Sequence, residues 1–206
     1  MGTREKIKQE LDRELIVRLF AARIEELDCY SGLLDEIKNK TPEEFFNETK
    51  RGDILLYFFY EEKGTKGFPP LEKIKLVEIE CINLIIHLMK YQGSKNAIKV
   101  TKQYILGKIQ EEELEEAHEW ACKVYHDFDC GERFQYNHEL YEVTIADLAR
   151  NVSDIDNYFY NDQNHVICDV VEAARESPFM SGKKVMKHCT DICKKRLWIP
   201  KDYLNH

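Results

Sequence analysis

The sequence predicts an all-α protein, a single-domain multi-helix bundle of about seven to nine helices spanning residues 1–206. Apolar side chains recur every three or four residues along most of the chain, which is the spacing of an amphipathic helix. Glycine and proline are scarce, at 9 and 5 of 206 residues, and this disfavours a turn-rich β architecture. A hydrophobic fraction of 43% is enough to build one core, and a chain of this length is expected to form one domain.

Two helices are expected before residue 53. The first spans residues 3–29, where leucine, isoleucine and phenylalanine recur at helical spacing. The second has a clear start, because Thr41 is a good N-cap and Pro42 suits the first helical position. Glu44, three residues after the cap, can close a capping box.

The centre of the chain is expected to hold the core helix. An apolar run at 53–62 fits a buried helix or a buried strand, and we interpret it as a helix capped by Asp53 because no partner strand is evident. The Gly/Pro-rich loop 63–70 is the best candidate for a seam between subdomains. Residues 71–91 then form the central core helix, which Gly93 ends. Further helices are expected at 95–106, which Gly107 ends, and at 111–128, 139–150, 155–175 and 182–197.

The charge is negative and unevenly distributed. The chain carries 30 basic and 38 acidic residues, a formal net charge of −8. Residues 183–206 hold seven basic side chains against two acids, a net of +5, so the rest of the chain carries −13. This acidity disfavours nucleic-acid binding. The basic segment can dock on the acidic body, face a partner, or form a solvated amphipathic helix, and we favour the last.

The densest negative charge lies at the start of the 111–128 helix. Six acids fall within nine residues, without a base among them: Glu111, Glu112, Glu113, Glu115, Glu116 and Glu119. Acids favour a helix N-terminus, but six exceed what the helix dipole needs. Such an excess attracts cationic partners. These glutamates are therefore candidate binding residues for a basic protein partner, and a solvated helix start is the alternative.

The cysteine content and the hydropathy of the chain indicate in which cellular compartment the protein is expected. Seven cysteines, an odd number, lie mostly in apolar helical patterns, and the N-terminal sequence has no apolar leader. Reduced thiols and a cytoplasmic location are expected. The longest apolar stretch, 82–89, is far shorter than the ~20 residues of a membrane helix, so no membrane partner is expected.

Two sets of side chains have the spacing of metal ligands. His118, Cys122 and His126 share one flank of a helix, because each four-residue step advances only 40° around the axis. Asp127 or Cys130 could add a fourth ligand, but packing at the edge of an apolar stripe explains the set as well, and we favour it. The pair His126-Asp127 also resembles the core dyad of HD-domain phosphohydrolases, with His87 as the earlier histidine. In that family the dyad holds a metal that activates water. The candidates for the later aspartate are Asp147, Asp169 and Asp191.

Two more patterns occur about as often as chance predicts. Arg133 and His138 resemble the motif of HEPN ribonucleases. The Glu-x-x-His segment 115–118, with Asp-x-x-His at 162–165, resembles a di-iron carboxylate site. That site needs two further inward glutamates. Glu78 and Glu80 are available on the 71–91 helix, but Glu78 is expected on its polar side. Since no enzyme motif exceeds its chance frequency, the sequence favours a non-enzymatic protein without a cofactor, although it leaves enzymatic activity open.

A longer stretch, residues 81–125, resembles the all-helical immunity proteins of bacterial polymorphic toxin systems. The similar features are a cysteine at the core helix, an Ala-Ile helix closing on Leu-Gly-Lys-Ile, an acidic helix start and small residues after it. Here these are Cys81, Ala97-Ile98, Leu106-Gly107-Lys108-Ile109, Glu111–Glu113, Ala117 and Ala121. The resemblance implies a cytosolic, non-enzymatic protein that binds and masks a toxin. An acidic inhibitor suits a cationic toxin such as a nuclease.

Overall fold

The computed structural model describes residues 40–62, 64–129, 140–154, 166–178 and 180–200. These ranges contain eight α-helices, one 3-10 helix and no strand, which confirms the all-α prediction. The elements are α3 (Pro42–Glu48), α4 (Gly52–Glu61), α5 (Leu71–Ile82), η2 (Ile86–Leu88), α6 (Gln92–Ile105), α7 (Glu111–Asp129), α8 (Leu140–Ser153), α10 (Val166–Glu176) and α11 (Gly182–Arg196). The helix expected at 3–29 and the first part of the one expected at 155–175 lie outside the described residues.

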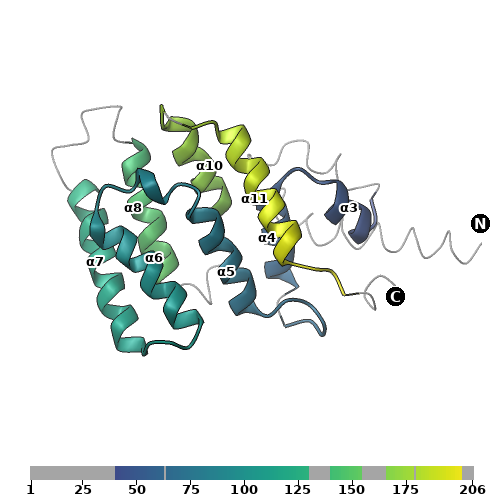
Figure 1. Cartoon of the computed structure of the whole chain (residues 1–206), viewed down its shortest axis with the longest axis horizontal. Helices are drawn as coiled ribbons and strands as arrows, with labels where there is room; N and C mark the ends of the chain where they lie inside the picture. The colour runs from purple at the N-terminus through teal and green to yellow at the C-terminus, as the bar shows by residue number, and fades with distance from the viewer. Residues whose placement is uncertain (1–39, 63, 130–139, 155–165, 179, 201–206) are drawn as a thin grey trace, which may run out of the picture.

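The helices form two groups that α10 connects. Helices α6, α7 and α8 pack against one another, and α4, α5 and α11 form the second group. Helix α10 contacts α8 on one side and α11, α5 and α4 on the other. Among the described elements, α7 lies at one end and α3 at the other (Figure 1).

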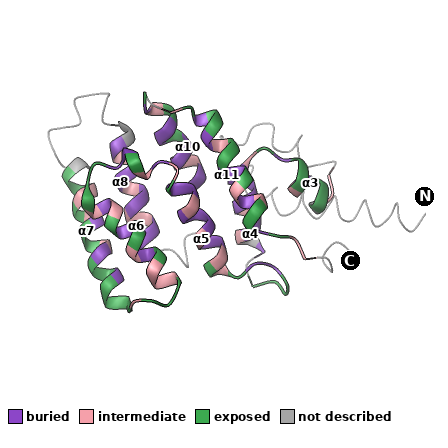
Figure 2. Ribbon diagram, viewed as in Figure 1, coloured by how far each residue is buried: buried purple, intermediate pink, exposed green. Residues whose placement is uncertain are grey.

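One hydrophobic cluster joins α3, α4, α5, α6, α8, α10 and α11. The buried residues, coloured purple in Figure 2, lie mainly where the helices face one another. Four phenylalanines, Phe45, Phe58, Phe59 and Phe68, meet edge to face with ring centroids 5.4–6.2 Å apart. Phe68 comes from the loop between α4 and α5, so this loop adds a side chain to the same cluster. Such aromatic pairs add to the stability that area burial provides.

The start of α3 has the predicted cap. The Glu44 backbone N–H donates to Thr41 Oγ1 at 3.3 Å, and the Thr41 N–H donates to Glu44 Oε2 at 2.9 Å. This capping box satisfies two N–H groups that the helix leaves unpaired.

The prediction of a helix over 53–62 is also confirmed, but the predicted cap is wrong. The N-cap of α4 is Arg51, whose guanidinium donates to the buried Asp53 carboxylate at 2.6–3.2 Å within the first turn.

The single helix predicted for 71–91 is wrong. Helix α5 ends at Ile82, and the chain then turns through the short helix η2. The N–H groups of Leu84 and Ile85 donate to carbonyls three residues back, at 3.1 and 2.9 Å, which tightens the chain into a 3-10 turn. Ile85 and Leu88 remain buried in this turn, so the apolar spacing continues although the α-helix does not. Gly93 does not end a helix, because it lies in the first turn of α6.

Helix α5 carries a buried ion pair between Lys75 and Glu78. The helical periodicity predicts that Glu78 is exposed, and this prediction is wrong. Glu78, expected on a polar side, is 0% exposed, and Lys75 is 2% exposed. Lys75 Nζ lies 3.8 Å from Glu78 Oε2 and 5.3 Å from the ring centroid of Tyr60 on α4. Burial raises the pKa of Glu78, while the Lys75 charge and the Tyr60 hydroxyl oppose that shift. The expectation failed because α4 covers this side of α5.

Part of the basic C-terminal segment docks on the acidic body. Lys194 Nζ donates to the Asn47 and Thr49 carbonyls, both at 2.7 Å, at the C-terminal end of α3. A cation there satisfies unpaired carbonyls and complements the helix dipole. Arg196 forms a two-pronged pair with Glu80 on α5, at 2.7 and 3.0 Å. The remaining basic side chains of α11 are exposed: Lys183, Lys184, Lys187 and Lys195.

The described cysteines are free thiols, namely Cys81, Cys122, Cys168, Cys189 and Cys193. Three of them, Cys81, Cys189 and Cys193, are fully buried between α5 and α11. The neighbouring Cys189 and Cys193 thiols, followed by burial, hold the pKa of Cys81 well above its usual range. These side chains therefore behave as small apolar core residues. None of the described helices has both the length and the hydropathy that a membrane-spanning segment requires.

Gly52 brings α4 against the backbone of α11. A Cβ atom on Gly52 would lie 2.8 Å from the Thr190 nitrogen and 3.0 Å from the Cys189 carbonyl carbon, so Gly52→Ala must push two helices apart. We expect it to lower the free energy of unfolding by about 1–3 kcal/mol in urea denaturation. Gly93→Ala is the control, because it meets the tip of the Val124 side chain at 3.2 Å and improves helix propensity. If the Gly52→Ala protein is as stable as the Gly93→Ala protein, α4 and α11 do not approach as closely at Gly52 as the structure shows.

Candidate functional site

Helix α7 presents the six predicted glutamates to solvent. Leu114, Ala117 and Ala121 bury one side of α7 against α6 and α8. The opposite side forms the exposed edge of the three-helix group (Figure 2). All six glutamates are exposed: Glu111, Glu112, Glu113, Glu115, Glu116 and Glu119. We call these residues the acidic face. One of them has a local role too, because the Gln110 N–H donates to Glu113 Oε1 at 3.2 Å and caps the helix start.

His118 and Cys122 form a polar junction between α7 and α8. His118 Nδ1 lies 3.1 Å from Ser153 Oγ, and Ser153 donates its own proton to backbone carbonyls of α8 at 2.8 and 3.0 Å. Ser153 therefore accepts from Nδ1–H, which assigns the His118 tautomer and leaves Nε2 as an acceptor. Cys122 Sγ lies 3.3 Å from that Nε2, while Asp154 Oδ2 is 4.0 Å away.

This junction favours a thiol over a thiolate. Burial is the first cause that raises the pKa of Cys122, and Asp154 and Glu119 add to it against the opposing charge of Arg150. A protonated thiol is a poor metal ligand and a poor nucleophile. The geometry thus agrees with the packing interpretation of His118 and Cys122, in which each finds a hydrogen-bond partner at the rim of the core.

The described residues contain no group of three or more His, Cys, Asp or Glu side chains that could hold a metal ion. Neither the set His118, Cys122 and His126 nor the set His87, His126 and Asp127 forms such a group, and all of these residues are described. Cys130 lies outside the described residues. His87 lies exposed on η2, and His126 with Asp127 lies exposed at the C-terminal end of α7. The segment 133–138, which carries the ribonuclease-like pattern, and the segment 162–165, the second half of the di-iron-like pattern, lie outside the described residues. Of the first half, Glu115 is exposed on α7.

A carboxylate cluster joins α8 and α10. Of the three aspartates considered for a hydrolase, Asp147 and Asp169 come together here, while Asp191 is exposed on α11. Burial, followed by the charges of Asp147 and Glu172, raises the pKa of the Asp169 carboxyl to about 7. Asp147 itself is paired with Arg150, whose guanidinium nitrogen lies 2.5 Å from Oδ1. In the folded protein the Asp169 carboxyl therefore keeps its proton at acidic pH and loses it only around neutral pH.

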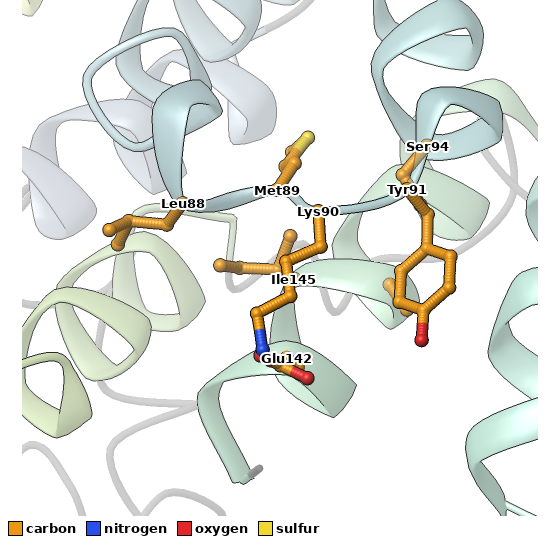
Figure 3. Close-up of a pocket in the computed structure, with 8 residues that line it drawn as sticks. Leu88, Met89, Lys90, Tyr91, Ser94, Glu142 and Ile145 are labelled. Atoms are coloured by element: carbon orange, nitrogen blue, oxygen red, sulfur yellow. The ribbon is translucent and has the colours of Figure 1, made fainter. Parts of the chain in front are cut away.

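A small hollow lies where the chain passes from η2 into α6. It is lined by Leu88, Met89, Lys90, Tyr91, Ser94, Glu142, Ile145 and Ala146. The Lys90 ammonium reaches across it to the buried Glu142 carboxylate on α8, as Figure 3 shows. Its accessible volume of about 10 Å³ suits a single water molecule. Pockets for small-molecule ligands are far larger, so this hollow does not offer a substrate site.

Two features of the described surface were not identified from the sequence. Trp120 is 53% exposed on α7, beside the acidic face. Its position was signalled, because it falls outside the apolar stripe of α7 and follows Glu116 by one helical turn. The Asp169 cluster carries no comparable signal, since Asp147 and Asp169 meet only through the packing of α8 on α10.

No family model matches this chain, and neither a curated protein nor a solved structure is similar to it.

Proposed function

We propose that this protein is a non-enzymatic, cytoplasmic binding protein whose acidic face takes a basic protein partner. An immunity-type inhibitor that masks a cationic toxin, for example a nuclease, is the specific form of this proposal. The observation that carries it is the exposure of all six glutamates on one edge helix whose other side is packed.

The arrangement suits recognition of a cationic surface. Six carboxylates on one rigid helix create a negative potential that accelerates encounter with a basic protein and disfavours acidic ones. Lys123 is the single lysine or arginine among residues 111–129, so little of this charge is neutralised within the helix. The hydrolase alternative with His87, His126 and Asp127 stays a prediction, and no contact in the described residues favours it.

The test compares two triple variants of equal charge. Glu112, Glu116 and Glu119 are changed to glutamine in the first, and the matched control changes exposed glutamates elsewhere, Glu43, Glu72 and Glu172. Each variant loses three negative charges, so non-specific attraction falls equally. The purified proteins are used to capture partners from cells of the source organism at 50 mM salt, and a captured protein is then titrated against each variant.

We expect a basic partner that the wild type and the control variant retain and that the acidic-face variant binds at least ten-fold more weakly. The affinity should fall steeply at 500 mM salt, where charges are screened beyond about 4–5 Å. If the toxin form of the proposal is correct, the partner's activity is lost on complex formation. An acidic or neutral partner, or equal binding by both triple variants, would overturn the proposal.

A further inference from the structure

Trp120 is the most exposed of the large hydrophobic side chains in the described residues. Trp198, at 46% exposed, is held by a hydrogen bond from its Nε1 to the Gly67 carbonyl at 3.1 Å. The Trp120 ring instead contacts a cation, since Lys123 Nζ lies 4.7 Å from the ring centroid. Tryptophan is enriched among the residues that dominate binding energy at protein interfaces.

The backbone beneath Trp120 is held closely by α6. A Cβ atom on Gly93 would lie 3.9 Å from the Trp120 Cβ and 3.2 Å from a Val124 methyl group. The first turn of α6 thus packs against α7 beneath Trp120 and Val124. A ring carried by a packed helix loses little freedom when a partner binds it, which favours affinity.

Acidic residues flank the ring along the helix axis. With 100° of rotation per residue, Glu113, Glu116 and Asp127 lie within about 40° of Trp120 around α7. Glu116 is one turn before the tryptophan, and Glu113 and Asp127 are two turns to either side. All three are exposed. A cation placed over the ring would therefore lie near carboxylates on the same face.

The contact with Lys123 shows that the face of the Trp120 ring is accessible to a cationic group. Its ammonium is one turn from Trp120, and the side chain is exposed, so it can leave the ring at little cost. An arginine from a partner would gain more, because its planar guanidinium stacks on an indole ring and pairs with a carboxylate at the same time.

We propose that Trp120 is the anchor of the docking surface on α7 and that it takes an arginine side chain of the basic partner, which displaces Lys123 and pairs with a neighbouring glutamate. This inference rests on the proposed function and specifies its partner: an arginine-bearing segment, where a lysine-bearing one binds more weakly. The charge complementarity between this face and a basic segment selects that occupant.

Two peptides of equal charge, hexa-arginine and hexa-lysine, test the proposal. The chain has two tryptophans, so Trp198→Phe leaves Trp120 as the single indole reporter. We expect hexa-arginine to change the Trp120 emission and to bind at least five-fold more tightly than hexa-lysine at 50 mM salt. Trp120→Ala, followed by calorimetry, should bring the two affinities within two-fold of each other.

Removal of the internal competitor gives a second measurement. Lys123→Gln should tighten hexa-arginine binding about three-fold, beyond the effect of its charge. Lys187→Gln on α11 is the control, because it makes the same charge change on an exposed helix of the other group. Equal effects of these two variants would contradict displacement of Lys123.

The two levels of the hypothesis can fail separately. If the Glu112/Glu116/Glu119→Gln variant loses hexa-arginine binding but Trp120→Ala does not, the anchor is wrong and the acidic docking face stands. If the glutamine variant binds both peptides as the wild type does, the proposed function fails as well. Circular dichroism should show an unchanged melting temperature for Trp120→Ala, because the ring is mostly outside the core.

Discussion

Glu78→Gln is expected to lower the melting temperature of the protein by about 10 °C. The change removes the carboxylate that faces Lys75 at 3.8 Å in a site where both residues are at most 2% exposed. Removal of one partner of a buried ion pair costs roughly 3–5 kcal/mol, because the remaining charge has lost its water and its counter-charge. In a chain of this size one kcal/mol corresponds to about 2–4 °C.

Two further variants distinguish the cost of leaving one charge buried from the cost of losing a salt bridge as such. Glu80→Gln breaks the pair with Arg196 on the same helix, but its side chain is 33% exposed, so the expected cost is under about 1 kcal/mol. The double variant Lys75→Met/Glu78→Leu replaces both buried charges with apolar groups and should recover most of the lost stability. If the Glu78→Gln and Glu80→Gln proteins have the same melting temperature, the buried ion pair contributes no more to stability than the partly exposed one, and the prediction is wrong.

Asp169→Asn is expected to stabilise the protein at pH 8 and to leave it unchanged near pH 4. The folded pKa of about 7 lies above the value near 3.9 that an aspartate has in an unfolded chain. The folded state therefore binds more protons between these pH values, and stability falls as the pH rises through this window. Three pKa units correspond to about 4 kcal/mol as an upper bound, so we expect a gain on the order of 2–4 kcal/mol at pH 8.

Thermal melts from pH 4 to pH 8 test this prediction. Asp191→Asn makes the same chemical change at an exposed position of α11 and should shift the melting temperature little at any pH. The groups recorded around Asp169 are Asp147 on α8 and Glu172 on α10, and Arg150 is held by Asp147. If Asp169→Asn gave the same gain at both ends of the pH range, a change in packing would explain it instead of proton binding.

The acidic face could be predicted from the sequence, because six acids within nine residues of an amphipathic helix have no place in a core of this size. The exposed tryptophan beside this face was missed. Trp120 was not recognised as exposed, although its distance from Leu114 and Ala117 around α7 already placed it at the border of the apolar stripe. The hydrophobicity of a side chain therefore does not by itself indicate whether an aromatic residue on an amphipathic helix is buried or exposed.

The metal hypotheses show the limits of spacing along one helix. His118, Cys122 and His126 share a flank of α7, yet that flank meets Ser153 of α8 at His118 and solvent at His126. Which of these occurs depends on where α8 lies around the axis of α7, and this is a property of two helices that are separate in the sequence. The same reason explains why Asp147 and Asp169, which are 22 residues apart, could not be paired beforehand.

The sequence by itself determined the features that depend on neighbours within one turn: the helical class, the cap at Thr41, the end of α6 at Gly107, where φ is +66°, and the negative charge of α7. Only the tertiary structure decided where α5 ends and that Glu78 is buried. These outcomes follow from the contacts of α5 with α4, α10 and α11. Local propensities act over a few residues, whereas the burial of a side chain depends on which distant helix covers it.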